Sequence, residues 1–170
     1  RGIFHFETVP ANDLEQRVSE IDSTYNLIGG STDRHPYTPL SDSLRDLTNG
    51  KVLPVEYRGA SPLNFIKDEY DTVTHAQFNR TVLLDEVMKA IRRRTIELSG
   101  YGDQENIVIQ HLRDLIRDEV PDKPATFLKL TGADHYFHAI AFYFAGLRIK
   151  GALVNMEDTD PRVMIGASAI

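Results

Sequence analysis

The stretch DHYFHAIAFYFAGLRIKGALVNMED, from Asp134 to Asp158, decides the fold predicted for this chain. It contains two β-like runs, HAIAFYFAG and RIKGALVNME, joined so tightly at Gly146 and Leu147 that the pattern predicts an antiparallel hairpin. With the turn centred on that pair, His138 lies opposite Asn155, and a small slip in register brings Glu157 near His138 instead. The sequence therefore predicts a histidine beside an amide or a carboxylate at the open end of a hairpin.

Amphipathic helices are expected before this hairpin. Apolar residues recur at helical spacing over 81–98 and again over 105–120, where Pro121 ends the pattern. Shorter helices with capping signals are expected at 12–23, 38–48 and 61–70. The stretch 28–39 is expected to be a loop, and 51–57 a short strand near a sheet edge because Pro54 cannot donate to a ladder. Further strands are expected at 125–132 and 162–170.

Helices followed by strands indicate an α+β fold, and the length of 170 residues indicates a single domain, 1–170. The predicted architecture is an antiparallel sheet with two long amphipathic helices and several short N-terminal helices. We find no internal repeat and no low-complexity tract.

The overall composition narrows the classes of partner. Charged residues make up 26% of the chain and the formal net charge is −6, which opposes nonspecific attraction to phosphate backbones or anionic membranes. No apolar run is long enough to span a membrane, and no signal peptide is apparent at the start of the sequence. We expect a soluble chain, intracellular or secreted into a host cell, with a protein partner or protein substrate, no nucleic acid and no cofactor.

The expected hairpin resembles the paired His and acid of YopJ-type acetyltransferase effectors, with His138 and Glu157 on consecutive strands. More broadly, His138 with Asn155 resembles the His and Asn or Asp hairpin of papain-like cysteine enzymes. This resemblance implies that His138 is a general base and that Glu157 or Asn155 orients its ring. In both families the nucleophile is a cysteine, and this chain contains none.

A nucleophile would therefore have been substituted or would lie outside this chain. In the papain-like order it stands at the start of a helix, and Ser61 in YRGASPLNF has that place in the sequence, as do Ser41 and Ser43 in TPLSDSL. Ordinary helix capping is the simpler explanation of a serine before Pro62. His138 can likewise be a hydrogen-bonded packing residue among aromatic neighbours.

Three other groups of residues point to different chemistry. Asp134, His135 and His138 are metal-ligand types, but on a strand His135 and His138 face opposite sides, so no metal site is predicted. The stretch VEYRGAS around Arg58 resembles the Arg-Gly strand of mono-ADP-ribosyltransferases, without that family's later Ser-Thr-Ser and Glu-x-Glu elements. The basic run of Arg92, Arg93 and Arg94 is either a charged helix surface or a small anion site.

Two functions follow as expectations. The first is a cysteine-dependent hydrolase or acyltransferase of effector type, with catalytic residues His138, Glu157, Asn155 and Ser61. The second is a noncatalytic interaction or assembly subunit in which the hairpin serves packing alone.

Overall fold

A five-stranded sheet forms the centre of the protein. The computed structural model describes residues 2–3, 5, 7–98, 105–119, 121, 125–130, 132–154 and 164–167. Within these ranges the sheet has the order β4-β5-β3-β2-β9. Strands β2 (Gly29–Asp33), β3 (Val52–Tyr57), β5 (Val73–Phe78) and β9 (Met164–Ala167) are parallel, and only β4 (Asn64–Lys67) runs antiparallel, against β5. The carboxyl ends of β2, β3 and β5 therefore meet at one edge, which we call the carboxyl edge.

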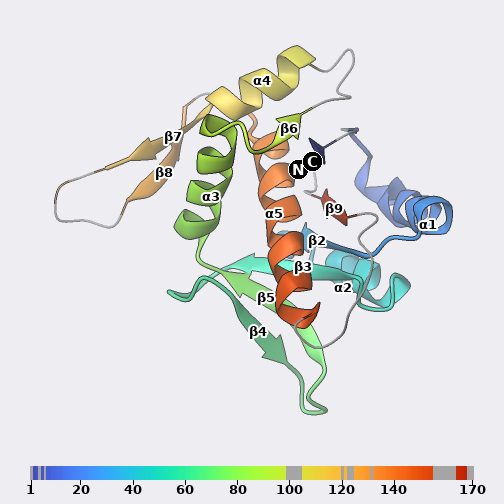
Figure 1. Ribbon diagram of the computed structural model, residues 1–170. Coiled ribbons are helices and arrows are strands. Elements are labelled where there is room, and N and C mark those ends of the chain that lie inside the picture. Colours follow the sequence, from blue (N-terminus) through green and yellow to red (C-terminus); the bar gives the residue numbers. More distant parts are fainter. Residues whose placement is uncertain are drawn as a thin grey trace.

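Helices cover both faces of this sheet. On one face, α5 (His135–Val154) lies along β2 and β9, with α3 (Arg80–Arg92) beside it (Figure 1). On the other face, α2 (Thr38–Leu47) packs on β3 and contacts α1 (Leu14–Tyr25), which follows the 3-10 turn η1 (Ala11–Asp13). The alternation of side chains along β3 shows the two layers, because Leu53 and Val55 join the core cluster that includes α5, while the fully buried Val52 lies outside that cluster.

The remaining elements lie outside the central sheet. Helix α4 (Glu105–Arg113) packs against α5 and leads into strand β7 (Leu115–Asp118), which pairs antiparallel with β8 (Thr126–Lys129). Figure 1 shows this hairpin standing away from the body of the protein. Strands β1 (Gly2–Ile3) and β6 (Glu97–Leu98) form a short parallel pair.

The hairpin predicted for 138–156 is wrong, because His135–Val154 is one continuous helix. The helix is apolar on nearly all sides: Phe137, Ile140, Ala141, Phe142 and Ala145 are all at most 1% exposed. A helix buried against a sheet on one side and against α3 and α4 on others shows no single apolar stripe, so its sequence reads like a pair of strands. Gly146 and Leu147 lie inside the helix and form no turn.

Several other local predictions are corrected. Residues 61–70 contain β4 and no helix, the stretch 28–39 holds the central strand β2, and the helix expected over 105–120 ends at Arg113 before β7. Strand β3 is central, and Pro54 is tolerated there because pairing with β5 begins only at Val55. The helix at Thr38–Leu47 is confirmed.

The combination of helices and strands confirms the α+β prediction, although the largest sheet is mixed and mainly parallel. Among the described residues no helix has both the length and the apolar character needed to cross a membrane.

Candidate functional site

The site begins with Asp33, the last residue of β2, at the carboxyl edge. Side chains alternate along a strand, so Asp33 faces the same side as Ser31, whose hydroxyl donates to the carbonyl of Phe142 in α5 at 2.6 Å. From Ser31 to Asp33 the strand advances about 6.6 Å, and from Phe142 back to His138 the antiparallel helix rises about 6 Å. Along the direction of β2, Asp33 therefore lies at the same height as His138 on α5, the helix that covers this strand.

His138 is held at this level by hydrogen bonds on both ring nitrogens. Its Nε2 lies 3.2 Å from Oδ2 of Asp134, one helical turn earlier, and its Nδ1 lies 3.1 Å from the hydroxyl of Tyr57 at the end of β3. Because Nε2 faces a carboxylate, we infer that Nε2 carries the proton and that the Tyr57 hydroxyl donates to Nδ1. Burial lowers the pKa of His138, and the charge of Asp134 only partly opposes this effect.

Asp134 is the second carboxylate of the site, at the entrance to α5. Its Oδ1 lies 3.2 Å from Nζ of Lys129, and its side chain is only 14% exposed. Burial alone would raise the pKa of Asp134, but His138 and Lys129 outweigh burial and lower it. Since His138 donates while neutral and Lys129 supplies a full charge, Asp134 is ionised at neutral pH.

Asp33 has a different environment. Burial raises its pKa, and the hydrogen bond from the backbone N–H of His35 to Oδ1, at 3.1 Å, opposes this only in part. The charge of His35 also lowers the pKa of Asp33, but burial outweighs both effects of His35. Among the described residues no lysine or arginine is paired with Asp33, so Asp33 is a carboxylate whose charged form burial disfavours.

The two carboxylates converge on Tyr57. Burial raises the pKa of Tyr57, and the negative charges of Asp33 and Asp134 both raise it further, while Arg80 opposes them. Two acids about 100 positions apart in the sequence therefore act on one hydroxyl at the carboxyl edge of the sheet. In open sheets of parallel strands this edge is where ligands bind.

The same edge gathers positive charge. Arg34 follows β2 directly, Arg58 follows β3 directly, and Arg80 opens α3 just after β5. Lys129 adds a fourth cation beside Asp134. The chain, with a net charge of −6, thus has a local group of cations at this edge, in which Arg34 and Arg58 pair with Glu56 and Lys129 pairs with Asp134.

The residues predicted from the sequence are dispersed. His138 belongs to the site, but Asn155 and Glu157 lie outside the described residues. Ser61 does not start a helix: it is exposed in the loop between β3 and β4, and its hydroxyl donates to the carbonyl of Leu63. Ser41 is buried in α2, on the other side of the sheet, where its hydroxyl donates to the carbonyl of Thr38.

Asp134, His135 and His138 were not expected to share a metal ion, because His135 and His138 would face opposite sides of a strand. On the helix that is found, the spacing of four brings Asp134 and His138 into contact. Asp33 and Tyr57 were not recognised from the sequence at all. The only signal was an acid after the small-residue run GGST, which is the last residue of a buried strand.

Comparison of the chain with models of protein families, with curated proteins and with solved structures gives no match. What the site does is therefore argued from its own chemistry. In the part of the chain that the structure describes, no cluster of three or more His, Asp or Glu side chains suits a metal ion.

Proposed function

We propose that this protein is a divalent-cation-dependent phosphodiester hydrolase that acts on nucleic acid, with Asp33 and Asp134 as the ligands of Mg²⁺ or Mn²⁺. The observation that carries the proposal is the series of contacts from Asp134 through His138 to Tyr57 at the carboxyl edge, with the partly buried Asp33 at the end of the neighbouring strand β2. Mg²⁺ prefers carboxylate oxygens and keeps waters, and in phosphoryl-transfer sites it rests on one or two carboxylates together with the substrate phosphate. A pair of acids, Asp33 and Asp134, suits that pattern.

When bound, such a cation would polarise the phosphoryl oxygen and activate the attacking water. The side chains of the chain have distinct parts in this scheme. Asp33 holds the cation because burial disfavours its charged form when no cation is bound, and Asp134 supplies a second oxygen ligand whose direction the His138 ring fixes. Lys129 and Arg80 offset the negative charge of the phosphate as it approaches two carboxylates.

Nucleic acid is favoured as the substrate because cations stand after three neighbouring parallel strands, at Arg34, Arg58 and Arg80. A row of guanidinium groups along a sheet edge matches a ligand with repeated phosphates better than one with a single phosphate. The overall acidity of the chain would weaken nonspecific binding and leave attraction concentrated at this edge.

The cysteine-dependent hydrolase or acyltransferase stays a prediction from the sequence, but its geometry has changed. The His138 ring bonds to Tyr57 and Asp134 and not to a partner across a hairpin. Tyr57 does not serve as a nucleophile here, since burial and two carboxylates keep its hydroxyl protonated.

The test is cleavage of labelled single-stranded and duplex oligonucleotides with Mg²⁺ or Mn²⁺, and with EDTA as the metal-free control. Asp33→Asn and Asp134→Asn are each expected to lower the cleavage rate roughly 100-fold or more, as the loss of a group that stabilises transition-state charge does. The matched control is Asp71→Asn, because Asp71 is 84% exposed in the β4–β5 turn at the other end of the sheet, and asparagine tolerates its φ of 64°. Cleavage that persists in EDTA, or in Asp33→Asn at the wild-type rate, refutes the proposal.

A further inference from the structure

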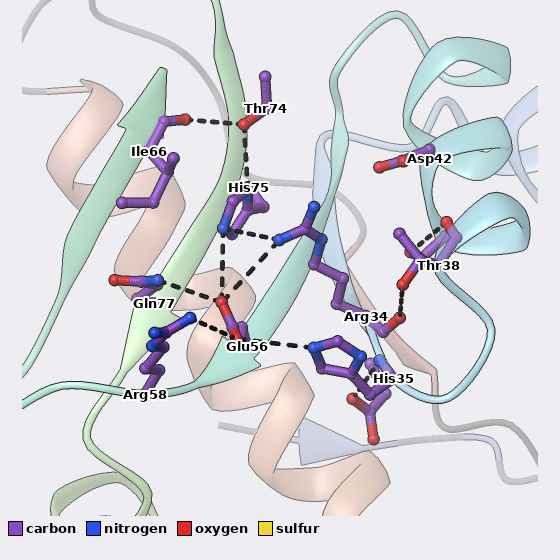
Figure 2. A network of polar contacts seen from close by, with 12 residues as sticks. Arg34, His35, Thr38, Asp42, Glu56, Arg58, Ile66, Thr74, His75 and Gln77 are labelled. Carbon is purple, nitrogen blue, oxygen red and sulfur yellow. Dashed lines mark hydrogen bonds and ion pairs between the residues drawn. The ribbon is translucent and has the colours of Figure 1, made fainter. Parts of the chain in front are cut away.

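A second polar cluster lies on the other side of the same strand end. It is centred on Glu56 of β3, whose side chain is 14% exposed and faces away from α5 because Val55 and Tyr57 face toward it. Figure 2 shows four potentially cationic side chains around this one carboxylate: Arg34, His35, Arg58 and His75. We call these five residues the Glu56 cluster.

The contacts in the Glu56 cluster are ion pairs of moderate length. The carboxylate lies 3.9 Å from Arg34, 3.7 Å from Arg58 and 3.6 Å from both His35 and His75, while a shorter hydrogen bond, at 3.1 Å, comes from Gln77. Two guanidinium groups, which are always charged, thus share one carboxylate. The Glu56 cluster carries one positive charge in excess even with both histidines neutral.

Arg34 is held firmly but is not fully satisfied. One of its terminal nitrogens lies 3.0 Å from Nε2 of His75, whose Nδ1 lies 3.0 Å from the Thr74 hydroxyl. An arginine can only donate, so His75 accepts through Nε2 and carries its proton on Nδ1. The Nε atom of Arg34 is buried and has no hydrogen-bond partner among the described residues. A buried donor without a partner costs free energy that an oxyanion ligand would recover.

The members of the Glu56 cluster differ in exposure in a way that suits a binding site. Glu56 and His75 are the buried members of the cluster, and the side chain of His75 is only 7% exposed. The side chains of Arg58 and His35, in contrast, are 72% and 60% exposed. Arg34 is intermediate and follows Asp33 directly, so the two side chains leave the strand end on opposite faces. Ligand groups bound by Asp33 and by the Glu56 cluster would therefore be neighbours.

We propose that Arg34, His35 and Arg58 bind a phosphate of the nucleic-acid strand next to the one that is cleaved, with Glu56 as the internal counter-ion that holds their side chains in place. This inference rests on the proposed function for the identity of the strand. The chemistry recognised is a phosphodiester oxyanion, which guanidinium groups bind through two parallel hydrogen bonds. Asp42 and Glu56 are the nearby acids that limit the affinity for a free anion.

Binding without catalysis tests the proposal. Fluorescence anisotropy of a labelled single-stranded oligonucleotide in EDTA, over a series of NaCl concentrations, gives the dissociation constant and its salt dependence. Arg58→Gln is expected to weaken binding roughly fivefold, uniformly across sequences, and to reduce the slope of log K against log salt by about 0.7.

Arg93→Gln is the matched control, since Arg93 is exposed at the end of α3 that lies at the far side of the sheet. Circular dichroism and the urea midpoint confirm that each variant is folded. The proposal is overturned if Arg58→Gln and Arg93→Gln bind alike, or if millimolar inorganic phosphate displaces the oligonucleotide equally from the wild type and from Arg58→Gln.

The failure of this inference is distinguishable from failure of the hydrolase proposal. Binding measured in EDTA tests the phosphate site without the metal site, because no divalent cation is then available, whereas cleavage with Mg²⁺ or Mn²⁺ tests the hydrolase. Weaker binding by Arg58→Gln without cleavage by any variant would support the phosphate site and refute the hydrolase. If Arg58→Gln cleaves and binds the oligonucleotide as the wild type does, the hydrolase is supported and the phosphate site is refuted.

Discussion

At the scale of single residues, the chain contains a carboxylate that lowers the stability of its own fold. Asp33 is partly buried, faces the inner side of α5 and has a raised pKa because burial disfavours its charged form. A raised folded-state pKa means that the stabilising contribution of this group is complete below its ordinary pKa and is lost as the pH rises through the folded value. At neutral pH the ionised Asp33 therefore lowers the free energy of unfolding, and a bound cation would offset this loss.

The first prediction concerns this cost. Asp33→Asn is expected to raise the free energy of unfolding at pH 7 relative to the wild type, by up to about 1 kcal/mol, since a neutral amide is less costly to bury. Mg²⁺ at millimolar concentration is expected to stabilise the wild type and not the variant. Urea unfolding with and without Mg²⁺ measures both effects, and an equal response of the two proteins to Mg²⁺ would refute a metal site at Asp33.

The second prediction concerns Tyr57. Tyr57→Phe removes the only hydroxyl bonded to Nδ1 of His138 among the described residues and leaves that buried nitrogen without a donor. We expect a loss of about 1–3 kcal/mol in the free energy of unfolding. The reference variant is Tyr70→Phe, because Tyr70 is 79% exposed and its loss should change the urea midpoint little. Similar midpoints for the two variants would contradict the hydrogen bond.

At the scale of elements, α5 is where structure and sequence differ most, and its helical state is directly testable. Gly151 is exposed inside α5, and a Cβ added there meets no atom within 4 Å. Gly151→Ala should therefore stabilise the protein by about 0.5–1 kcal/mol, because alanine is the better helix former. Ala152→Gly, at the next exposed position, should destabilise it by a similar amount. Chemical denaturation checks both changes. A loss of stability in Gly151→Ala together with a gain in Ala152→Gly would argue against a helix through these positions.

The elements that could be predicted are those whose signals are local. Thr38 and Pro39 at the start, and the left-handed Asn49 and Gly50 after the end, mark α2 in the sequence, and the structure places the helix there. Elements buried on several sides were missed because they show no such local signal. Strand β2 is made of small residues covered on both faces, and α5 is apolar all round, so neither shows the period that identifies its type.

The candidate site could be predicted only in part for the same reason. His138 was recognised as a chemical group, but its partner was sought across a hairpin and not one helical turn away at Asp134. Asp33 and Tyr57 come from neighbouring parallel strands whose pairing depends on crossover helices. Such pairing is set by tertiary packing, which a single sequence does not display locally.

At the scale of the whole molecule, histidines link stability to pH. Burial lowers the pKa of His75, His111 and His138, so each is neutral in the folded state. In the unfolded chain they titrate near their ordinary pKa of about 6.5, so the unfolded state takes up more protons and stability is lost as the pH falls below that value.

We expect the free energy of unfolding to decline from pH 7.5 to pH 5.5, by at most about 1.4 kcal/mol per pH unit for each histidine. His111→Asn keeps an acceptor for the backbone N–H of Tyr136 and should reduce this slope. His5→Gln, at a position 63% exposed, should leave it unchanged. Denaturant titrations at several pH values measure the slopes, and a flat profile for the wild type would contradict the buried neutral histidines.

The hydroxyl of Ser31 bonded to the carbonyl of Phe142 has a consequence for the order of assembly. This contact joins segments separated by more than 100 positions, and it is one of many contacts between α5 and β2. Long-range pairings of this kind form after local helices and turns, because closing the intervening loop must come first. Asp33 and Asp134 therefore remain apart in a nascent or half-folded chain, and the proposed nuclease would gain its activity only in the last stage of folding.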